Sequence, residues 1–545
     1  MTLERRAWTI ARVTTILLVL VSLRIIYWQM VRGNEIQPVA VNLVQAAGEY
    51  ADVEGDQGED THSAVEFLTG VSTVKELESL PQPVIQRTTD LLETIQRGAI
   101  YDRNGRLLAV DRPSPDGEVT RFYAEPSLAH TIGYVSGLRT GVAGVELKYN
   151  NTLLGLDRPD TQIEQMLNKP ISGSDLILTV DSFVQRAAEN ALGDRSGAIL
   201  VLDGQSGAVL ALASTPRFDA NRVLDGAYVS ELVNGCDDGP DCRAPFLNRA
   251  TQALYPPFDF GEPVQGSDGP YYVYNVDGYN IIDPNHRENQ LNLEMSFAKS
   301  ANAAFARIGD EMPADTLSDY ASRFGFGSPG EISFPLDIEY TPAQLAQDPE
   351  RLYDNDLLRA VTAIGQGELL TSPLNIGMVV LSVLNEGNLP VPYFVQSVKE
   401  PGGRVVEDLP NRHTLKNLMK PATAQQVRQM MIRVVEKGSG QKAQIPGLIV
   451  GGKTGTAQVG GDMLPHAWFT GFAQNETQEV VVVVLVENGG EGSQVAAPIF
   501  AEVAEAALSH IGEPVEEIIA VPVASPTATS ETAQVTQAPA ATSTP

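Results

Sequence analysis

The stretch from Gly447 to Ala473 reads GLIVGGKTGTAQVGGDMLPHAWFTGFA, and it decides the fold class. Its two apolar runs, Leu448 to Val459 and Ala467 to Ala473, are typical of β-strands and are separated by GGDMLPH. A third run, Val480 to Val486, is almost unbroken valine, which indicates a strand that is buried on both faces. Three strands this close together predict one antiparallel sheet.

Two further strands and a set of helices accompany these three strands. The runs GAILVLD (197–203) and AVLALAS (208–214) flank Gly204 to Gly207, which predicts a hairpin of buried strands. Two strands, a helical middle, three strands and a closing helix predict an α+β domain, an antiparallel sheet with helices on both sides. The expected helices are Leu293 to Ile308, Thr316 to Phe324, Leu357 to Ile364, Pro373 to Asn385, Ala424 to Glu436 and Pro498 to Ile511.

A small β-rich module is expected before this domain. The segment RGAIYDRNGRLLAV (97–110) has strand-like ends around the turn Asp102 to Gly105, and DLILTV (175–180) reads as another strand. Asp181 is placed to cap a helix that runs to Leu192. The chain is therefore divided into a cytoplasmic tail (1–12), a transmembrane anchor (13–31), an acidic linker with helical spacing (32–96), the module (97–192), the main domain (193–512) and a tail rich in Pro, Thr and Ala that is expected to be disordered (513–545).

The N-terminus carries a membrane signal. Val13 to Val31 is largely apolar, with Arg24 as its one charge, and it follows Arg5, Arg6 and Arg12. A helix of about 19 residues spans roughly 28 Å, close to the thickness of a bilayer core. Basic residues before the span and acidic chain after it place the N-terminus in the cytoplasm and the bulk of a single-pass protein outside. A buried core helix is the alternative for this run.

The composition of the chain excludes some classes of binding partner. The net charge of -30 comes from 38 Lys and Arg against 68 Asp and Glu, and so acidic a surface repels phosphate. No nucleic acid partner is therefore expected. Cys236 and Cys242 enclose the turn formers DDGPD, so they form either a disulfide loop or two free thiols. Their spacing fits no common zinc pattern, and no metal site is expected.

Two short motifs carry the chemistry. Lys453-Thr454-Gly455-Thr456 lies on the first of the three closing strands, and Ser300-Ala301-Asn302 lies in the helical stretch LEMSFAKSANAAFARIG. In their order and surroundings these motifs resemble those of the penicillin-binding transpeptidases. Two earlier segments are similar to the non-catalytic pedestal module of class B members, namely RGAIYDRNGRLLA and GYVSGLRTGVAGVELKYN. The resemblance implies a peptidoglycan D,D-transpeptidase with the fold shared by penicillin-binding proteins and serine β-lactamases.

The resemblance also implies roles for these residues. Ser300 relays a proton, and Asn302 hydrogen-bonds the substrate amide. The edge of the strand that carries Lys453 to Thr456 pairs with an extended stem peptide. The glycine of that motif leaves room for the peptide, the lysine offers positive charge to a carboxylate or a hydroxyl, and the threonines donate hydrogen bonds. The implied partners are peptidoglycan stem peptides, β-lactams, the cytoplasmic membrane of a bacterium and a wall-synthesis glycosyltransferase, with no cofactor.

The motif that supplies the nucleophile is absent. Family members carry a stretch like Asn-Arg-Ala-Thr-Gln-x-x-Tyr-x-Pro-Gly-Ser-Thr-Phe-Lys, but here NRATQALYPP (248–257) is followed directly by FDFGEP (258–263). The simplest account is an internal deletion of about one long helix between Pro257 and Phe258. In the implied mechanism the serine attacks a D-alanyl-D-alanine peptide, and the lysine one turn later accepts the serine's proton. No covalent penicillin label is therefore expected on this chain.

Other candidates for the nucleophile are weak. Ser296 and Lys299 fit Ser-x-x-Lys by spelling, but they directly precede Ser300 on the same expected helix, whereas the family's two serines come from different elements. His466 is expected to be structural. Three interpretations remain open: an active cell-wall D,D-transpeptidase, an inactive scaffold of the same fold in a wall-synthesis complex, or a truncated form of an active enzyme through a gene or sequencing deletion.

Overall fold

The computed structural model describes the chain from residue 95 to residue 510 with several gaps. The gaps are 114–118, 136–138, 159–160, 162–169, 235–243, 258–263, 266–271, 284–290, 331, 407–408, 410–411 and 460–462. The predicted anchor (13–31), Cys236, Cys242 and the predicted disordered tail (513–545) lie outside the described residues. Every helix in the described part is too short or too polar to cross a membrane.

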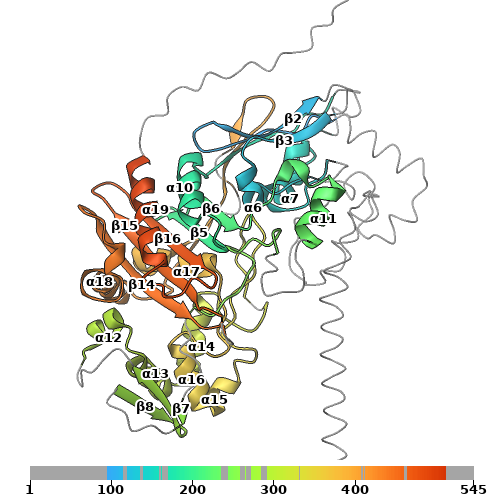
Figure 1. Cartoon of the computed structure of the whole chain (residues 1–545). Helices are drawn as coiled ribbons and strands as arrows, with labels where there is room; N and C mark the ends of the chain where they lie inside the picture. Colours follow the sequence, from blue (N-terminus) through green and yellow to red (C-terminus); the bar gives the residue numbers. More distant parts are fainter. Residues whose placement is uncertain are drawn as a thin grey trace, which may run out of the picture. The chain divides into compact units, whose positions relative to one another are not determined.

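A five-stranded antiparallel sheet forms the centre of the main domain (Figure 1). The strand order is β14-β15-β16-β5-β6, so the two strands that come first in sequence pair onto the last of the three closing strands. All five predicted strands are confirmed. Their bounds are β5 (Gly197–Asp203), β6 (Val209–Thr215), β14 (Ile449–Ala457), β15 (His466–Gln474) and β16 (Glu479–Val486).

Helices cover both faces of this sheet, as predicted. Leu200 and Val483 pack in the same apolar cluster as Met378 of α17, whereas Val201 and Val484 pack on the opposite face. Successive side chains of a strand point to opposite faces, which explains why the valine run is buried throughout. The second face is covered by α10 and α19 (Figure 1). The helix bounds are α10 (Ser182–Leu192), α17 (Pro373–Leu384), α18 (Pro421–Lys437) and α19 (Ala496–His510).

The predicted helix from Leu293 to Ile308 is wrong in one respect, because it is two helices. Helix α12 (Leu293–Lys299) ends at Ser300, and α13 (Asn302–Glu311) begins two residues later. Ser300 has a left-handed backbone with φ 58° and ψ 51°, a conformation that residues with side chains adopt rarely. The helical spacing of apolar residues continues through the break and conceals it. Ser296 and Ser300 therefore do not share a helix.

A three-stranded sheet that was not predicted packs beside α13. Its order is β7-β9-β8, and α13 contacts both β8 and β9. The elements of this region are β7 (Val264–Gln265), β8 (Tyr272–Val276), β9 (Tyr279–Asp283), α14 (Ala314–Arg323), α15 (Arg351–Asp354) and α16 (Asp356–Ala363), with α11 (Gly226–Asn234) nearer the start of the domain. The two predicted helices at 316–324 and 357–364 are confirmed as α14 and α16.

The first part of the described chain supplies β1 to β4 of a six-stranded sheet, in the order β12-β11-β4-β1-β2-β3, and the main domain supplies β11 and β12. The predicted hairpin is confirmed, with Ile100 of β1 opposite Ala109 of β2. Asp181 caps α10 as predicted, because its side chain accepts hydrogen bonds from the backbone of Phe183 and Val184. The elements are β1 (Ile100–Tyr101), β2 (Leu107–Pro113), β3 (Val119–Tyr123), α6 (Ala129–Ile132), α7 (Gly144–Lys148), α8 (Asn150–Leu154), β4 (Asp175–Leu178), β11 (Val395–Lys399) and β12 (Val405–Val406).

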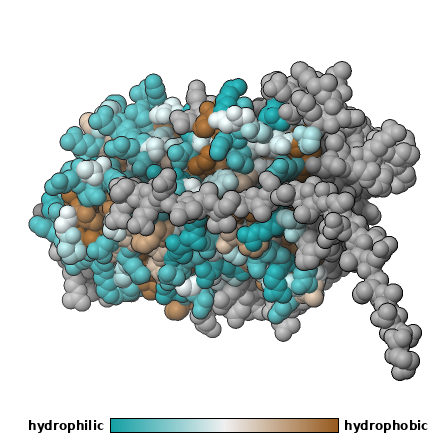
Figure 2. Space-filling view, turned by 90° about the horizontal axis from the view of Figure 1, so that it is seen from above, coloured by the Kyte–Doolittle hydropathy of each residue, from teal (hydrophilic) through white to brown (hydrophobic). Residues whose placement is uncertain are grey.

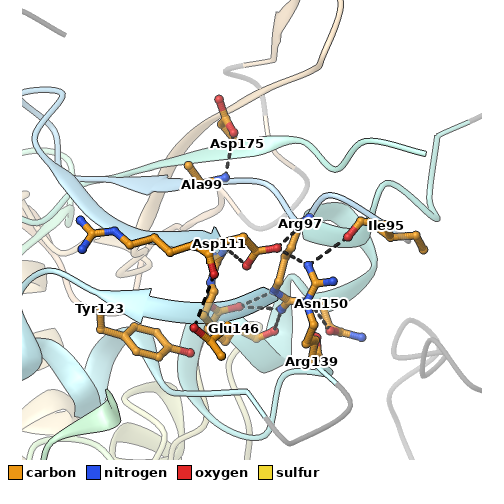
Figure 3. Close-up of polar contacts among 12 residues, drawn as sticks. Ile95, Arg97, Ala99, Asp111, Tyr123, Arg139, Glu146, Asn150 and Asp175 are labelled. Carbon is orange, nitrogen blue, oxygen red and sulfur yellow. Dashed lines mark hydrogen bonds and ion pairs between the residues drawn. The ribbon is translucent and has the colours of Figure 1, made fainter. Parts of the chain in front are cut away.

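A buried cluster of charges joins this sheet to α7 (Figure 3). Glu146 is fully buried, and its two carboxylate oxygens accept hydrogen bonds from the Nε atoms of Arg97 and Arg121, each at 2.7 Å. Asp111 accepts a further bond from Arg121 at 3.2 Å and forms an ion pair with Arg139. Burial alone would raise the pKa of Glu146, but Arg121 and Arg97 hold it below its ordinary value. The cluster therefore keeps this carboxylate ionised inside the protein.

The described surface is mainly hydrophilic on the face shown in Figure 2, where apolar residues form small separate groups. The most exposed large apolar side chains of the described residues are Leu464 at 62% and Leu224 at 61%. They belong to different segments, the β14–β15 connection and the turn before α11. Singly exposed apolar residues of this kind are common on soluble domains and indicate no particular partner.

Candidate active site

Strand β14 forms one edge of the five-stranded sheet, and within the described residues it pairs with β15 alone. Lys453 lies opposite Thr470, and Gly455 lies opposite Trp468. An edge strand leaves backbone N–H and C=O groups unpaired, and an extended peptide can pair with them. The Lys-Thr-Gly-Thr motif therefore lies where a peptide can add to the sheet as a further strand.

Lys453 and Ser300 are brought into direct contact, although 153 positions separate them in the sequence. The Lys453 ammonium donates a hydrogen bond to Ser300 Oγ at 2.7 Å and another to the carbonyl of Thr454 at 2.9 Å. The left-handed turn at the end of α12 brings the serine hydroxyl to β14. Burial lowers the pKa of Lys453 to about 8. The lysine is therefore mostly cationic at neutral pH and loses its charge in a mildly basic range.

Asn302 is fixed by a carboxylate that the sequence did not reveal. Its backbone N–H donates to Asp283 Oδ1 at 2.5 Å, and the N–H of Ala303 donates to the other oxygen at 3.2 Å. Asp283 is the last residue of β9 and is only 2% exposed. A carboxylate at the first turn of a helix satisfies N–H groups that lack helical partners and suits the positive end of the helix dipole. Asp283 therefore positions the start of α13 and, with it, Asn302.

The two threonines of the motif also have defined partners. Thr454 shares a hydrogen bond of 2.6 Å with the hydroxyl of Ser439, in the turn that follows α18. Thr456 Oγ1 accepts the backbone N–H of Gly492 at 3.2 Å. Ser439 also begins a Ser-x-x-Lys spelling, but its lysine, Lys442, is exposed and hydrogen-bonds Gln494 instead. The threonine hydroxyls therefore connect β14 to the turns on either side of it.

The segment that precedes the absent motif ends against the same strand. A Cβ atom on Gly455 would lie 2.5 Å from the carbonyl oxygen of Pro257, so only glycine fits at that position. Tyr255 exchanges two backbone hydrogen bonds of 2.8 Å with Thr371, and its hydroxyl donates to Glu487 at 2.7 Å. Pro257 is therefore held beside β14 at the point where family members continue into Gly-Ser-x-x-Lys.

His466 makes contacts of a structural kind, and Ser296 is buried in α12. Nδ1 of His466 accepts the backbone N–H of Asn488 at 3.0 Å, its ring meets Tyr255 edge to face, and burial lowers its pKa. Ser296 is 3% exposed and lies one turn before the end of α12, near Lys299. Lys453 donates a hydrogen bond to the hydroxyl of Ser300.

Asp283 and Ser439 had faint signals in the sequence. Asp283 ends the run YNIID, which is a short strand followed by a carboxylate, and Ser439 lies between two glycines in the stretch that leads into the motif. Neither pattern is specific, because each residue acts on a distant part of the sequence. Asp283 caps the start of α13, and Ser439 contacts Thr454. Only the fold brings these residues together.

Comparisons with known proteins agree with this geometry. The family model "Penicillin binding protein transpeptidase domain" matches residues 264–505. The peptidoglycan D,D-transpeptidase PbpA of Mycobacterium tuberculosis is 29% identical over 466 residues, which cover 77% of this chain and 90% of that protein. Residues 264–505 therefore form a transpeptidase domain of the penicillin-binding type, and the chain is similar to class B penicillin-binding proteins. The peptidoglycan D,D-transpeptidase MrdA of Acinetobacter baumannii is 27% identical over 449 residues, 70% of this chain and 66% of that protein.

Solved structures of such proteins share the fold of this chain. A ceftriaxone acyl-enzyme complex of penicillin-binding protein A from M. tuberculosis superposes with a TM-score of 0.65 at 27% identity, covering 77% of this chain and 100% of that one. The D,D-transpeptidase domain of a peptidoglycan glycosyltransferase from Eggerthella lenta gives a TM-score of 0.64 at 29% identity, covering 77% and 99%. The predicted penicillin-binding transpeptidase fold is therefore confirmed.

Proposed function

We propose that this chain is a membrane-anchored protein of bacterial peptidoglycan synthesis, of the D,D-transpeptidase type, whose β14 edge binds stem peptides. One observation carries the proposal: Lys453 on an edge strand hydrogen-bonds Ser300 at 2.7 Å, next to an Asn302 that Asp283 fixes. A cation, hydroxyls and a free strand edge are what an extended peptide with a terminal carboxylate requires. The names of PbpA and MrdA support the same reaction class.

The reaction of this type exchanges one acyl partner for another. A serine hydroxyl attacks the carbonyl between two D-alanines and passes its proton to a base, the terminal D-alanine leaves as the protonated amine, and an ester forms. The amine of a second stem peptide then attacks the ester, which forms the cross-link and releases the serine. Donors at β14 hold the substrate for both steps. In this sequence the serine and lysine expected after Pro257 are absent, and Phe258 follows instead.

A second candidate is a scaffold that binds stem peptides without cleaving them. The direct succession of Pro257 and Phe258 favours it, because Lys453 and Ser300 lie on elements other than the one that would supply the nucleophile. A deletion in the gene of an active enzyme would produce the same chain. Sequencing the gene across the junction of Pro257 and Phe258 in several isolates distinguishes the two cases. A deletion in every isolate favours the scaffold, and a deletion in one isolate alone favours a defective gene copy.

The supporting parts of the proposal come from the sequence and the first sheet. The apolar run 13–31 would anchor the chain in the cytoplasmic membrane, with the rest outside. The six-stranded sheet would serve as the pedestal of the main domain, and a glycosyltransferase of wall synthesis would be the partner that supplies glycan strands. Penicillins and other β-lactams would bind at β14 as mimics of the stem peptide.

The test uses the full chain in detergent and a diacetyl-L-lysyl-D-alanyl-D-alanine peptide. We expect calorimetry to show binding by the wild type and its loss in Lys453→Met, while Lys437→Met, on the exposed end of α18, leaves it unchanged. Equal binding by both variants, or none by the wild type, would contradict the proposed function. Release of D-alanine during the same incubation would favour the enzyme over the scaffold.

A further inference from the structure

The buried charge cluster between the six-stranded sheet and α7 carries more positive than negative charge (Figure 3). Its ion pairs form a chain that runs from Arg97 to Glu146, and on through Arg121 and Asp111 to Arg139. Within the described residues, three guanidinium groups thus share two carboxylates, and each of the five side chains is at most 9% exposed. An excess of buried positive charge is unfavourable unless an anion compensates it.

The neighbouring carboxylate of Asp175 does not supply this compensation. Its Oδ1 accepts the backbone N–H of Ala99 at 2.8 Å, and among the described residues it forms no ion pair with an arginine (Figure 3). Burial outweighs the positive charges around it and raises the pKa of Asp175. A carboxylate in this position is a weaker source of negative charge than Glu146 or Asp111, so the excess remains.

Two hydrogen-bond donors of the same cluster lack an acceptor among the described residues. Arg121 uses its Nε for Glu146 and its Nη1 for Asp111, but its Nη2 is buried without a hydrogen-bond partner. The hydroxyl of Tyr123 is also buried without one. Buried donors are nearly always satisfied in folded proteins, by the protein itself or by a bound molecule. These two groups therefore indicate a ligand that accepts hydrogen bonds.

The two donors lie on the same side of strand β3. Arg121 and Tyr123 are two residues apart on this strand, so their side chains point to one face of the sheet. Figure 3 shows the Tyr123 ring directed toward Glu146, the carboxylate that Arg121 binds. Burial and the charge of Glu146 raise the pKa of Tyr123 well above its ordinary value, so its hydroxyl keeps its proton. The backbone of Val135 lowers this pKa and so acts on the oxygen as a donor, which leaves the proton without an acceptor.

An anion fits these donors better than a water molecule does. A water that accepted both bonds would bring two O–H groups that need acceptors of their own. The oxygens of Glu146 and Asp111 already accept bonds from arginines. An anion needs no acceptor, and it balances the excess charge as well. Because the surrounding side chains are buried, a monatomic ion suits the site better than a polyatomic one.

We propose that Arg121 and Tyr123 form a structural anion site, in which Nη2 of the arginine and the hydroxyl of the tyrosine hold a chloride ion. The ion would complete the charge cluster and strengthen the contact of β3 with α7. This inference is independent of the proposed function, because it concerns the first sheet and not the β14 edge. Failure of either one leaves the other standing.

The experiment follows thermal unfolding of the full chain in detergent by circular dichroism, with chloride replacing gluconate at constant ionic strength. The variants are Tyr123→Phe, which removes one donor and keeps the ring, and Tyr320→Phe, a control at an exposed position of α14. A ligand that binds only the folded state raises Tm, here by about 2 °C at a roughly tenfold excess over its Kd. We expect this saturable rise in the wild type and in Tyr320→Phe, and its loss in Tyr123→Phe.

A second measurement locates the ion directly. Crystals of the full chain grown in bromide should show an anomalous peak in contact with Nη2 of Arg121 and the hydroxyl of Tyr123. A density feature there without anomalous signal would identify a buried water and overturn the proposal. So would a wild type whose Tm is the same in chloride and gluconate. An equal rise in the wild type and Tyr123→Phe would show a general salt effect, which also overturns it.

Discussion

Replacing Glu146 by glutamine removes a charge from the most buried ion cluster of the described chain while keeping the side chain's size. Glu146 uses one oxygen for Arg97 and the other for Arg121, each at 2.7 Å. Glutamine has one acceptor oxygen, so one guanidinium would face an amide NH2 group, with donor against donor. Asp111 would still pair with Arg121 and Arg139, but the side chain of Arg97 would lose its ionised partner. Breaking a buried pair on one side costs about 3–5 kcal/mol, and we expect Glu146→Gln to lose stability of that size.

The measurement is urea unfolding followed by tryptophan fluorescence and circular dichroism at pH 7. A matched control is Glu311→Gln, because the Arg307–Glu311 pair is 57% and 60% exposed and such pairs contribute less than about 1 kcal/mol. A variant Glu146→Gln whose transition lies within about 1 kcal/mol of the wild type would refute the reasoning. It would mean that the cluster relaxes by admitting water, so that the buried charges are not held by this carboxylate.

The same variant gives a pH test with a definite sign. The pKa of Glu146 lies below its ordinary value of 4.5 in the folded protein, because the two arginines outweigh its burial. Its ionised form therefore stabilises the fold above pH 4.5, and this contribution is lost as the pH falls through the lowered pKa. We expect the stability difference between wild type and variant to narrow with acid. A difference that widens in acid would contradict this assignment.

Three further predictions concern the site. Binding of the free-acid stem peptide should weaken as pH rises through about 8, because Lys453 loses its charge there; affinity that stays flat from pH 6.5 to 9.5 would contradict this. Asp283→Ala should lower the unfolding free energy by about 1–2 kcal/mol, because α13 loses its cap. The same variant should bind the peptide more weakly, because Asn302 is no longer held in place. Unchanged peptide binding would show that the cap does not position Asn302 for binding. Incubation with a fluorescent penicillin should leave no covalent label on this chain, and an adduct mapped by mass spectrometry to Ser296 would show that its Ser-x-x-Lys spelling is functional.

The elements that sequence predicted are those with strong local patterns. The valine run of β16 and the glycine turn between β5 and β6 each determine their own structure. The misses depend on distant partners: β12 has two residues and exists because it pairs with β11, and the break at Ser300 becomes visible only through the bond to Lys453. A short strand is stabilised by its neighbour more than by its own residues.

The site divides in the same way. Lys453, Ser300 and Asn302 were found through motifs, because the chemistry requires fixed residue types at fixed spacing. Asp283 and Ser439 are joined to that site by a helix cap and a hydroxyl contact, and many residue types can make such contacts. A single sequence therefore indicates the motif residues and omits the residues that hold them in place.

The two modules predicted from sequence are joined more closely than their boundary at residue 192 suggests. Strand β11 from the main domain pairs with β4 of the first sheet, and the buried carboxylate of Asp337 accepts the N–H groups of Phe394 and Val395 at 2.9–3.0 Å where β11 begins. The hydroxyl of Tyr149, from the first module, donates to the same carboxylate at 3.4 Å. A hinge between the modules would break these bonds and leave Asp337 buried without its donors, which is costly. The β14 edge is therefore rigidly connected to the six-stranded sheet, and the two modules form one unit whether or not the chain completes the chemistry itself.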